Sequence, residues 1–288
     1  MRRYKFTVID ISELKSYAKV NLFLHVLNKR KDGYHNISSL LTRIDLFDVI
    51  TITESSKLEI IYKGLHSNEI VDDNILKLIT LLKEKDLIKN FNYRIIIEKR
   101  IPIGAGLGGG SSNVATIINV IKDLNIFKDN VDIVSIARHL GSDIEFFLYN
   151  QSALVNNKGS VENLIDIEKT QNILLVNPKV NLSTAKVFSS NTSYSKKIDL
   201  DISTPLRNLE KIMKFTSNEL EDSAIELCPD IHVIKNEMNK QKNLVVSRMS
   251  GSGSTYFGIF EDKQATLLAK EYFIKNYPHW WTTATRTI

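Results

Sequence analysis

The chain has only one cysteine, Cys228, among its 288 residues. It therefore cannot form an intrachain disulfide, and a zinc cluster built from several cysteines is excluded. A reducing compartment, the cytoplasm, is the expected location. Because Cys228 precedes Pro229 in an apolar context, we interpret it as a buried structural thiol rather than a nucleophile.

Long hydrophobic runs are also absent from the sequence. No window approaches the roughly 18 to 20 uninterrupted apolar residues of a membrane span. The N-terminus, MRRYKFTVIDI, begins with basic residues, but Asp10 and Glu13 interrupt it before an apolar stretch develops. We therefore expect neither a signal peptide nor a membrane partner. The 43% hydrophobic and 25% charged residues match a soluble globular protein.

A basic stripe is missing as well, although the formal net charge is +5. The lysines are scattered over predicted helix faces such as 83–89 and 235–242, and no aromatic residues are interleaved with them. This pattern argues against a nucleic-acid partner. An anionic small molecule fits the charge equally well, and a monomer or weak homodimer is expected.

Hydrophobic patterns predict an α+β fold in two lobes of unequal size. The short β-branched runs that predict strands in the first half lie at 19–26, 49–53, 58–62 and 93–98. The segments with apolar residues at helical spacing lie at 74–85, 112–124 and 131–140. Further along, we expect a strand at 172–176, helices at 208–215, 231–239 and 263–272, and a strand-turn-strand over 244–260. The division is placed at residues 1–165 and 166–288, with 189–205 as an exposed polar excursion.

The segment 103–113, IGAGLGGGSSN, holds five of the chain's twelve glycines. It follows a predicted strand, whose ladder Pro102 would stop, and leads into a predicted helix that starts at about Ser112. Glycines at such a connection let backbone N–H groups converge on one anion, next to the positive end of the helix dipole. Ser111 and Ser112 can cap the helix or contact a phosphate-bound cation. Phosphate binding is therefore favoured over a merely flexible turn.

Several known phosphate loops do not fit this segment. A Walker A loop needs a lysine at its end, and none stands there. The dinucleotide fingerprint is formally met by Gly104, Gly106 and Gly109, but the acidic residue that would follow, Asp123, falls inside the predicted helix. Protein-kinase triplets are missing too.

The segment 102–113 resembles the phosphate loop of the GHMP kinases, the superfamily of galactokinase, homoserine kinase and mevalonate kinase. Three more stretches stand in the family's order: 18–24 together with 32–35, 140–143, and 248–254. They are most similar to the branch whose acceptor carries a cytidine diphosphate. The resemblance implies a two-lobed GHMP kinase fold, with a ribosomal-protein-S5-like N-terminal lobe and a ferredoxin-like C-terminal lobe. It also implies ATP as phosphoryl donor, Mg²⁺ held mainly through the nucleotide phosphates rather than by a metal site of the protein, and a small-molecule acceptor.

By this resemblance, Asp143 is the catalytic base and Lys19 is its partner, which helps to polarise the acceptor hydroxyl. Taken by themselves, the residues leave other interpretations open. Asp143 follows a predicted helix end and could be an N-cap, and Lys19, in the middle of a strand, could be a charge that protects a sheet edge.

The resemblance also assigns the remaining site residues. Those expected to contact ATP are Asn74, Lys99, Pro102, Gly104, Gly106, Leu107, Gly108, Gly109, Gly110, Ser111 and Ser112. Those expected to contact the acceptor are Asn21, Tyr34, His35, Thr184, Phe188, Gly251 and Ser252. Tyr34 and Phe188 would stack on the two faces of the cytosine, and His35 would contact its edge.

Simpler interpretations remain for several of these positions. Asn74 could be a helix N-cap and Lys99 an exposed charge at a strand end. His35 could be a surface histidine and Phe188 a core residue. The glycines near Gly251 could serve only a tight hairpin.

Two positions depart from the family's pattern. Glu145 stands where a proline is usual after the catalytic aspartate, which predicts a less rigid turn. Leu41 stands where an aromatic residue is common near the nucleobase.

Two rival functions share some of these sequence features. A kinase of the same type could act on mevalonate, homoserine or a sugar, but the segment 32–35, DGYH, argues against it. A non-catalytic nucleotide- or RNA-binding α+β protein would have no use for Lys19 together with Asp143.

Overall fold

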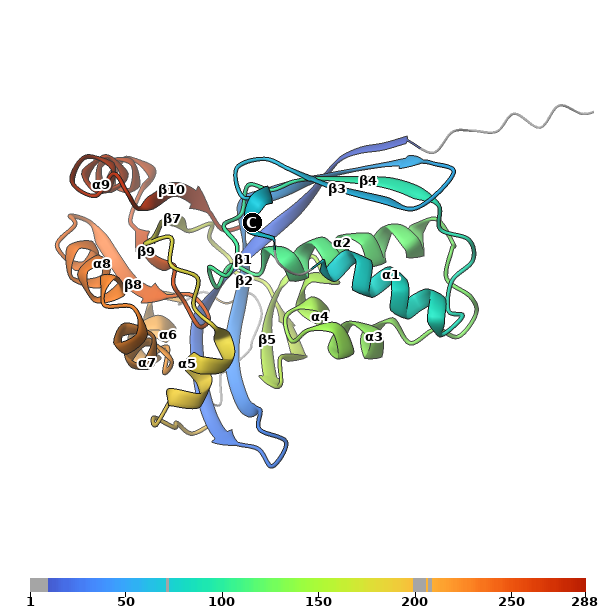
Figure 1. The fold of residues 1–288 in the computed structure, drawn as a ribbon. Coiled ribbons are helices and arrows are strands. Elements are labelled where there is room, and N and C mark those ends of the chain that lie inside the picture. The colour runs from blue at the N-terminus through green and yellow to red at the C-terminus, as the bar shows by residue number, and fades with distance from the viewer. Residues whose placement is uncertain (1–9, 71–72, 199–205, 207–208) are drawn as a thin grey trace, which may run out of the picture.

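Two long antiparallel strands, β1 (Asp10–Lys29) and β2 (His35–Glu54), run through the middle of the molecule (Figure 1). The computed structural model describes residues 10–70, 73–198, 206 and 209–288. The first lobe lies on one side of this pair of strands and the second lobe on the other. Side chains of both strands therefore take part in the cores of both lobes.

The first lobe is built on a sheet with the order β3-β4-β2-β5-β6, in which β1 also pairs with β2. Its shorter strands are β3 (Glu59–Lys63), β4 (Tyr93–Glu98), β5 (Ser152–Asn157) and β6 (Ser160–Ile165). A 3-10 turn, η1 (Ser67–Glu69), and α1 (Asn74–Glu84) connect β3 to β4. These two strands are parallel, as a helical crossover allows.

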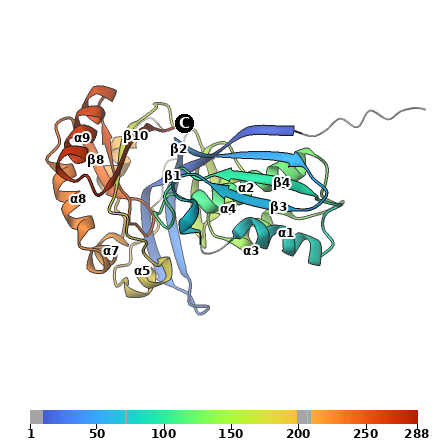
Figure 2. The same ribbon diagram turned by 45° about the horizontal axis from the view of Figure 1, so that its top comes forward.

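Helices cover one face of this sheet, as Figure 2 shows. After α1 come α2 (Gly109–Asp123), α3 (Ile133–Leu140) and α4 (Ile144–Phe147). The buried side of α2, which includes Val114, Ile117, Ile118 and Ile121, packs in one cluster with Ile95 and its neighbours in the sheet. This packing fixes the start of α2 relative to β2 and β4.

The second lobe has a four-stranded antiparallel sheet with the order β10-β7-β9-β8. Its strands are β7 (Asn172–Asn177), β8 (Leu244–Met249), β9 (Tyr256–Phe260) and β10 (Trp281–Arg286). Its helices are α5 (Thr184–Ser190), α6 (Leu209–Phe215), α7 (Glu221–Leu227), α8 (Asp230–Asn239) and α9 (Lys263–Asn276). The fourth strand lies beside the first and the third beside the second, which is the ferredoxin-like arrangement expected from the resemblance.

Most of the predicted elements are present, but some bounds differ. β1 and β2 are far longer than the runs 19–26 and 49–53, because bulges in their pairing interrupt the alternation that marks a strand. Helix α2 begins at Gly109, not at Ser112. The elements that the hydrophobic pattern did not predict are β5, β6, α4, α5, α7 and β10.

The polar excursion 189–205 is only partly covered by the structure. Residues 189–198 are mostly exposed, as predicted, although Asn191 is buried. Residues 199–205, and Asn208 of a predicted helix, lie outside the described residues. Within the described part of the chain, no helix is both long and apolar enough to cross a membrane.

Candidate active site

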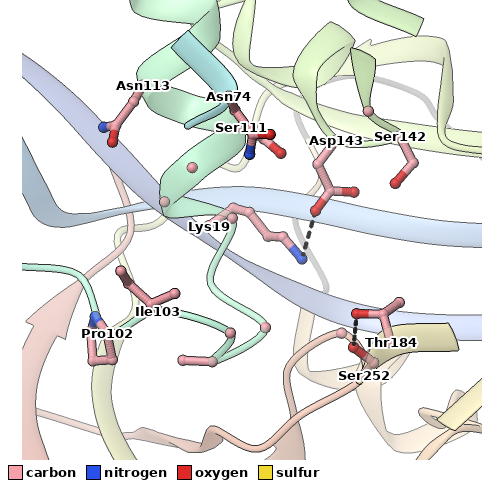
Figure 3. Close-up of a pocket in the computed structure, with 18 of the residues that line it drawn as sticks. Lys19, Asn74, Pro102, Ile103, Ser111, Asn113, Ser142, Asp143, Thr184 and Ser252 are labelled. Atoms are coloured by element: carbon pink, nitrogen blue, oxygen red, sulfur yellow. Dashed lines mark hydrogen bonds and ion pairs between the residues drawn. The ribbon is translucent and has the colours of Figure 1, made fainter. Parts of the chain in front are cut away.

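A cleft of about 530 Å³ lies where the glycine-rich loop, β1, the start of α4 and the second lobe meet (Figure 3). Both lobes contribute to its lining. Of the predicted site residues, those that line it are Lys19, Asn21, Asn74, Lys99, Pro102, Gly104, Gly106, Gly108, Gly109, Gly110, Ser111, Asp143, Thr184, Phe188, Gly251 and Ser252. The fold thus brings together residues from nearly the whole chain.

The glycine-rich loop connects β4 to α2 and forms one wall of the cleft. Gly106 has a φ of 75°, and a side chain there would collide with the carbonyl oxygen of Ser250 in the second lobe. Gly108, with a φ of 69°, is the N-cap of α2. The first turn of a helix leaves backbone N–H groups without intrahelical partners, so α2 presents donors and its positive dipole end to the cleft. An anion is the ligand that this wall can bind.

Lys19 and Asp143 meet across the cleft (Figure 3). The Lys19 ammonium lies 3.3 Å from Asp143 Oδ2 and donates a hydrogen bond of 2.6 Å to Asn21 Oδ1. The Lys19 side chain is 4% exposed and that of Asp143 32% exposed, so the carboxylate remains within reach of a ligand. Among the described strands, β1 pairs with β2 alone, but Lys19 does not extend into solvent from that strand. Its ammonium is buried against Asp143, so the interpretation of Lys19 as a charge that protects a sheet edge is wrong.

Asp143 holds the N-cap position of α4, but its side chain makes no capping hydrogen bond to the described residues of that helix. The carboxylate is turned to Lys19 instead. Asp143 therefore occupies the N-cap position, but its side chain does not cap the helix. A carboxylate held beside an ammonium group can orient and deprotonate a hydroxyl that approaches it from the cleft.

The turn after β8 closes the opposite side of the cleft and is hydrogen-bonded to the glycine-rich loop. Ser250 Oγ donates to the carbonyl oxygen of Gly106 at 3.0 Å, and the Thr255 backbone N–H donates to that of Ala105 at 3.3 Å. Ser252 Oγ lies 3.0 Å from Thr184 Oγ1 at the start of α5, as Figure 3 shows. The turn that contains Gly251 therefore contacts both the glycine-rich loop and α5, and it does more than connect β8 to β9.

The aromatic residues are arranged differently from the predicted sandwich. His35, 7% exposed, stacks on Phe188 with ring centroids 5.3 Å apart and an interplanar angle of 28°. Tyr34 is 60% exposed, and the Lys158 ammonium lies 3.4 Å from its ring centroid. Tyr34 and His35 are not among the described residues that line the cleft, whereas Phe188 is. The interpretation of His35 as a surface histidine is wrong, because its ring is buried.

Burial, with a smaller contribution from the Lys29 charge, lowers the pKa of His35 below its usual value of 6.5. The unfolded chain therefore binds more protons than the folded one as the pH falls through about 6.5. We expect the free energy of unfolding to decrease from pH 7.5 to pH 5.5, and part of this decrease to disappear in His35→Gln. Urea unfolding at several pH values and an NMR titration of the ring test it. A folded-state pKa of 6.5 or above would contradict it.

Asn74 and Lys99, both expected to contact ATP, line the cleft, and the simpler interpretation of each is wrong. The N-cap of α1 is Asp73, whose carboxylate accepts from the Leu76 N–H, so Asn74 is not the cap. Lys99 is 3% exposed and pairs with Asp48, so it is no exposed strand-end charge.

Two residues expected at the nucleotide do not line the cleft among the described residues. Leu107 belongs to the hydrophobic core, although its carbonyl oxygen accepts a hydrogen bond from the backbone N–H of Lys19. The Ser112 hydroxyl is buried and accepts from Ser16 Oγ at 2.8 Å. Because α2 begins at Gly109, Ser112 lies one turn past the cap and faces the sheet, while Ser111 faces the cleft.

The two residues that depart from the family's pattern, Glu145 and Leu41, are both buried. Glu145 is buried and forms two hydrogen bonds with Arg138, at 2.5 and 2.8 Å, which tie α4 to α3. Such a bidentate pair restrains the turn by a different means from a proline. Leu41 is buried in the first lobe and lines the cleft.

The pattern did not single out Asp48 and Asn113 as functional. Asn113 lines the cleft beside Lys99, and Asp48 is buried behind them. The one available signal was a polar residue on the otherwise apolar face of a predicted helix, since Asn113 precedes Val114 and Ile117.

Comparisons with known proteins agree over most of the chain. The GHMP kinases N terminal domain matches residues 73–151, and the GHMP kinases C terminal family matches residues 202–279. The 4-diphosphocytidyl-2-C-methyl-D-erythritol kinase of Thermotoga maritima is 36% identical over 260 residues, which cover 86% of this chain and 92% of that protein. The protein of the same name from Pelagibacter ubique is 35% identical over 96% of this chain and 99% of its own length.

Solved structures give the same picture. A crystal structure of 4-(cytidine 5'-diphospho)-2C-methyl-D-erythritol kinase superposes with a TM-score of 0.78 and 28% identity, covering 96% of this chain and 98% of that one. Homoserine kinase from Cytophaga hutchinsonii has a TM-score of 0.66 at 15% identity, with 100% and 96% of the two chains covered. At that identity the second similarity concerns the fold alone.

Proposed function

The chain belongs to the GHMP kinases and, within them, to the 4-diphosphocytidyl-2-C-methyl-D-erythritol kinases, and on this basis we propose that it phosphorylates the 2-hydroxyl of 4-diphosphocytidyl-2-C-methyl-D-erythritol with ATP. This reaction belongs to the non-mevalonate route to isoprenoid precursors. The rival acceptors and the non-catalytic binder are not favoured, since the relatives that share about a third of the residues carry this one name. The single structural observation that supports catalysis is the Lys19–Asp143 pair in the cleft.

In the proposed reaction, the acceptor hydroxyl enters between Asp143 and the γ-phosphate of ATP. Its oxygen forms the new bond to phosphorus, the bond from phosphorus to the ADP oxygen breaks, and the hydroxyl proton passes to the Asp143 carboxylate. Lys19 holds that carboxylate and adds positive charge near the transferred group. The N–H groups at the start of α2 would bind the phosphates that remain on ADP.

Mg²⁺ would neutralise charge on the phosphates when it is bound. Among the described residues, no group of three or more His, Cys, Asp or Glu side chains could hold a metal ion. Ser111 Oγ and the Asp143 carboxylate are among the oxygen atoms that line the cleft near the glycine-rich loop. We propose that the metal would be held mainly by the nucleotide phosphates, with Ser111 as a protein contact.

The acceptor would lie at the Phe188 end of the cleft, near Asn21, Thr184 and Ser252. Phe188 offers one aromatic face to the cytosine, and a neutral His35 has both a hydrogen-bond donor and an acceptor for the base edge. Tyr34 would have to leave Lys158 in order to cover the other face of the base.

The proposed function is tested by a coupled assay of ADP release with a panel of acceptors. We expect turnover with 4-diphosphocytidyl-2-C-methyl-D-erythritol and little or none with mevalonate, homoserine or galactose. The same polyol without its cytidine diphosphate should be a poor substrate, because it lacks the base that Phe188 would contact. Preferred turnover of one of the other acceptors would overturn the substrate and leave the reaction type intact.

A binding prediction separates the phosphates from the nucleoside. If the glycine-rich loop binds phosphates, ATP or ADP at about 100 times its Kd should stabilise the fold by about 2.7 kcal/mol. Adenosine at the same concentration should stabilise it much less. Thermal unfolding with each ligand measures the difference, and equal protection by all three would contradict the assignment of the loop.

Other parts of the proposal concern the whole molecule. We propose a cytoplasmic monomer or weak homodimer that binds small molecules and no nucleic acid. The lobes are proposed to divide at residues 1–165 and 166–288, between the last strand of the first sheet and β7.

A further inference from the structure

Asp48 is a fully buried carboxylate on β2, at the point where pairing with β4 stops. The last pair of that ladder is Val49 with Glu98. Beyond this pair, the Asp48 side chain takes the place of the backbone hydrogen bonds between the strands. Its Oδ1 accepts from the backbone N–H groups of Arg100, at 2.7 Å, and Ile101, at 3.0 Å. The chain that enters the glycine-rich loop is therefore bound to β2 through this carboxylate.

The other oxygen of Asp48 contacts the chain that leaves the loop. Oδ2 accepts from Asn113 Nδ2 at 3.0 Å, in the early part of α2, and pairs with the Lys99 ammonium. Lys99 in turn donates to Asn113 Oδ1 at 2.9 Å. One carboxylate thus has four donors, three from the chain that enters the glycine-rich loop and one, Asn113, from the chain that leaves it.

Ser16 on β1 extends this network. Its hydroxyl donates to Ser112 Oγ at 2.8 Å and accepts from Asn113 Nδ2 at 2.9 Å. Ser16 and Asp48 do not line the cleft among the described residues, whereas Lys99 and Asn113 do. In Figure 3, Asn113 on α2 and Pro102 at the loop entry lie on the side of the loop away from the catalytic pair.

A buried ion pair with this environment is not explained by stability alone. Replacing such pairs by apolar residues is often neutral or stabilising, whereas a fully hydrogen-bonded network fixes one geometry. Here the fixed geometry is the distance between the two ends of the loop. We infer that Asp48 is a positioning residue, which shapes the phosphate loop for ATP by joining the chain on both of its sides.

The inference rests on the proposed use of ATP and predicts which ligand is affected. In Asp48→Asn, the affinities for ADP and for inorganic tripolyphosphate should fall by about 10- to 100-fold, the cost of a small misplacement of binding groups. The affinity for adenosine and the KM for the acceptor should stay within about 3-fold, because the network holds the phosphate loop and not the rest of the cleft. Calorimetric titration of each ligand and steady-state kinetics give these values.

Two further variants keep the test decisive if Asp48→Asn folds poorly. Ser16→Ala removes the hydroxyl shared by Ser112 and Asn113 without leaving a buried charge, and should give the same pattern at about 3- to 10-fold. Met238→Ala opens a cavity in α8 of the second lobe, and should lower the Tm without a selective loss of phosphate binding.

The outcomes separate this inference from the proposed function. If the unmodified protein does not bind ADP, the proposed function fails and the inference fails with it. If it binds ADP but Asp48→Asn and Ser16→Ala bind tripolyphosphate normally, the positioning role alone is overturned. The role is also overturned if adenosine and acceptor binding weaken as much as tripolyphosphate binding, since the network would then support the fold in general.

Discussion

Asp143→Asn is expected to lower kcat by about 10²- to 10⁴-fold, because asparagine keeps the shape of the side chain but cannot accept the hydroxyl proton. The affinities for ADP and for the acceptor should change little. The fold should survive, since the Asp143 side chain is partly exposed and Lys19 keeps its hydrogen bond to Asn21. Steady-state kinetics and thermal unfolding of the same preparation measure both.

Lys19→Met and the double variant show whether the pair acts as a unit. Lys19→Met should also lower kcat, and the double variant should be little worse than the poorer single one, because residues that act together lose their effect together. Glu210→Gln is the matched control. It removes an exposed carboxylate on α6, which pairs with Lys214 and does not line the cleft among the described residues, and should leave kcat within about 3-fold.

Each outcome points to a definite mechanism. If the losses from Asp143→Asn and Lys19→Met simply multiply, the two side chains act independently. If Asp143→Asn turns over nearly normally, the reaction needs no base at this position, as a loose phosphoryl transition state would allow. The kinase activity would then stand, and Asp143 would be a group that only orients the acceptor.

The sequence predicted those parts of the site that depend on short segments. A run of glycines between a strand and a helix is typical of a loop that binds an anion, and this loop does line the cleft. The closeness of Lys19 and Asp143 followed from the resemblance, since no periodicity relates residues so far apart in the chain. In the structure, Lys19 Nζ lies 3.3 Å from Asp143 Oδ2.

Long-range polar contacts could not be predicted in this way. Asp48 lies 51 residues from Lys99 and 65 from Asn113 along the chain, and nothing in the segment around Asp48 marks it as buried. The alternative interpretation of Lys99, an exposed charge at a strand end, is wrong for the same reason: the burial of a charge depends on a partner supplied by another strand. The pairing of β2 with β4 brings Asp48 close to Lys99, and the packing of α2 against the sheet adds Asn113.

Strand length was hidden by backbone irregularity. The pairing of β1 with β2 shifts register at four places, among them between Tyr17 and Ala18 and between Asn21 and Phe23. Where one extra residue is inserted, as between Asn21 and Phe23, the following side chains move to the other face, so the alternation of apolar and polar residues breaks although the strand continues. The shift after Asn21 lies immediately beside the cleft.

Gly108→Val is expected to reduce the affinity for ADP by at least about 100-fold and to make protection by ADP as weak as that by adenosine. Gly108 has a φ of 69°, and a Cβ there would lie 2.9 Å from the Phe147 ring and 3.2 Å from Lys19 Cε. A β-branched residue at positive φ costs about 1–3 kcal/mol. The first turn of α2 would have to shift, and its N–H groups would no longer converge on the phosphates.

Gly33→Val is the matched control for this variant. Gly33 also has a positive φ, 83°, but no atom lies within 4 Å of the position of its Cβ. The substitution should therefore cost a similar backbone strain in the turn between β1 and β2, without moving α2. Calorimetric titration with ADP should show nearly normal binding for Gly33→Val and none measurable for Gly108→Val. Equal binding by the two variants would contradict the prediction, because the left-handed glycine at the start of α2 would then not be needed for phosphate binding.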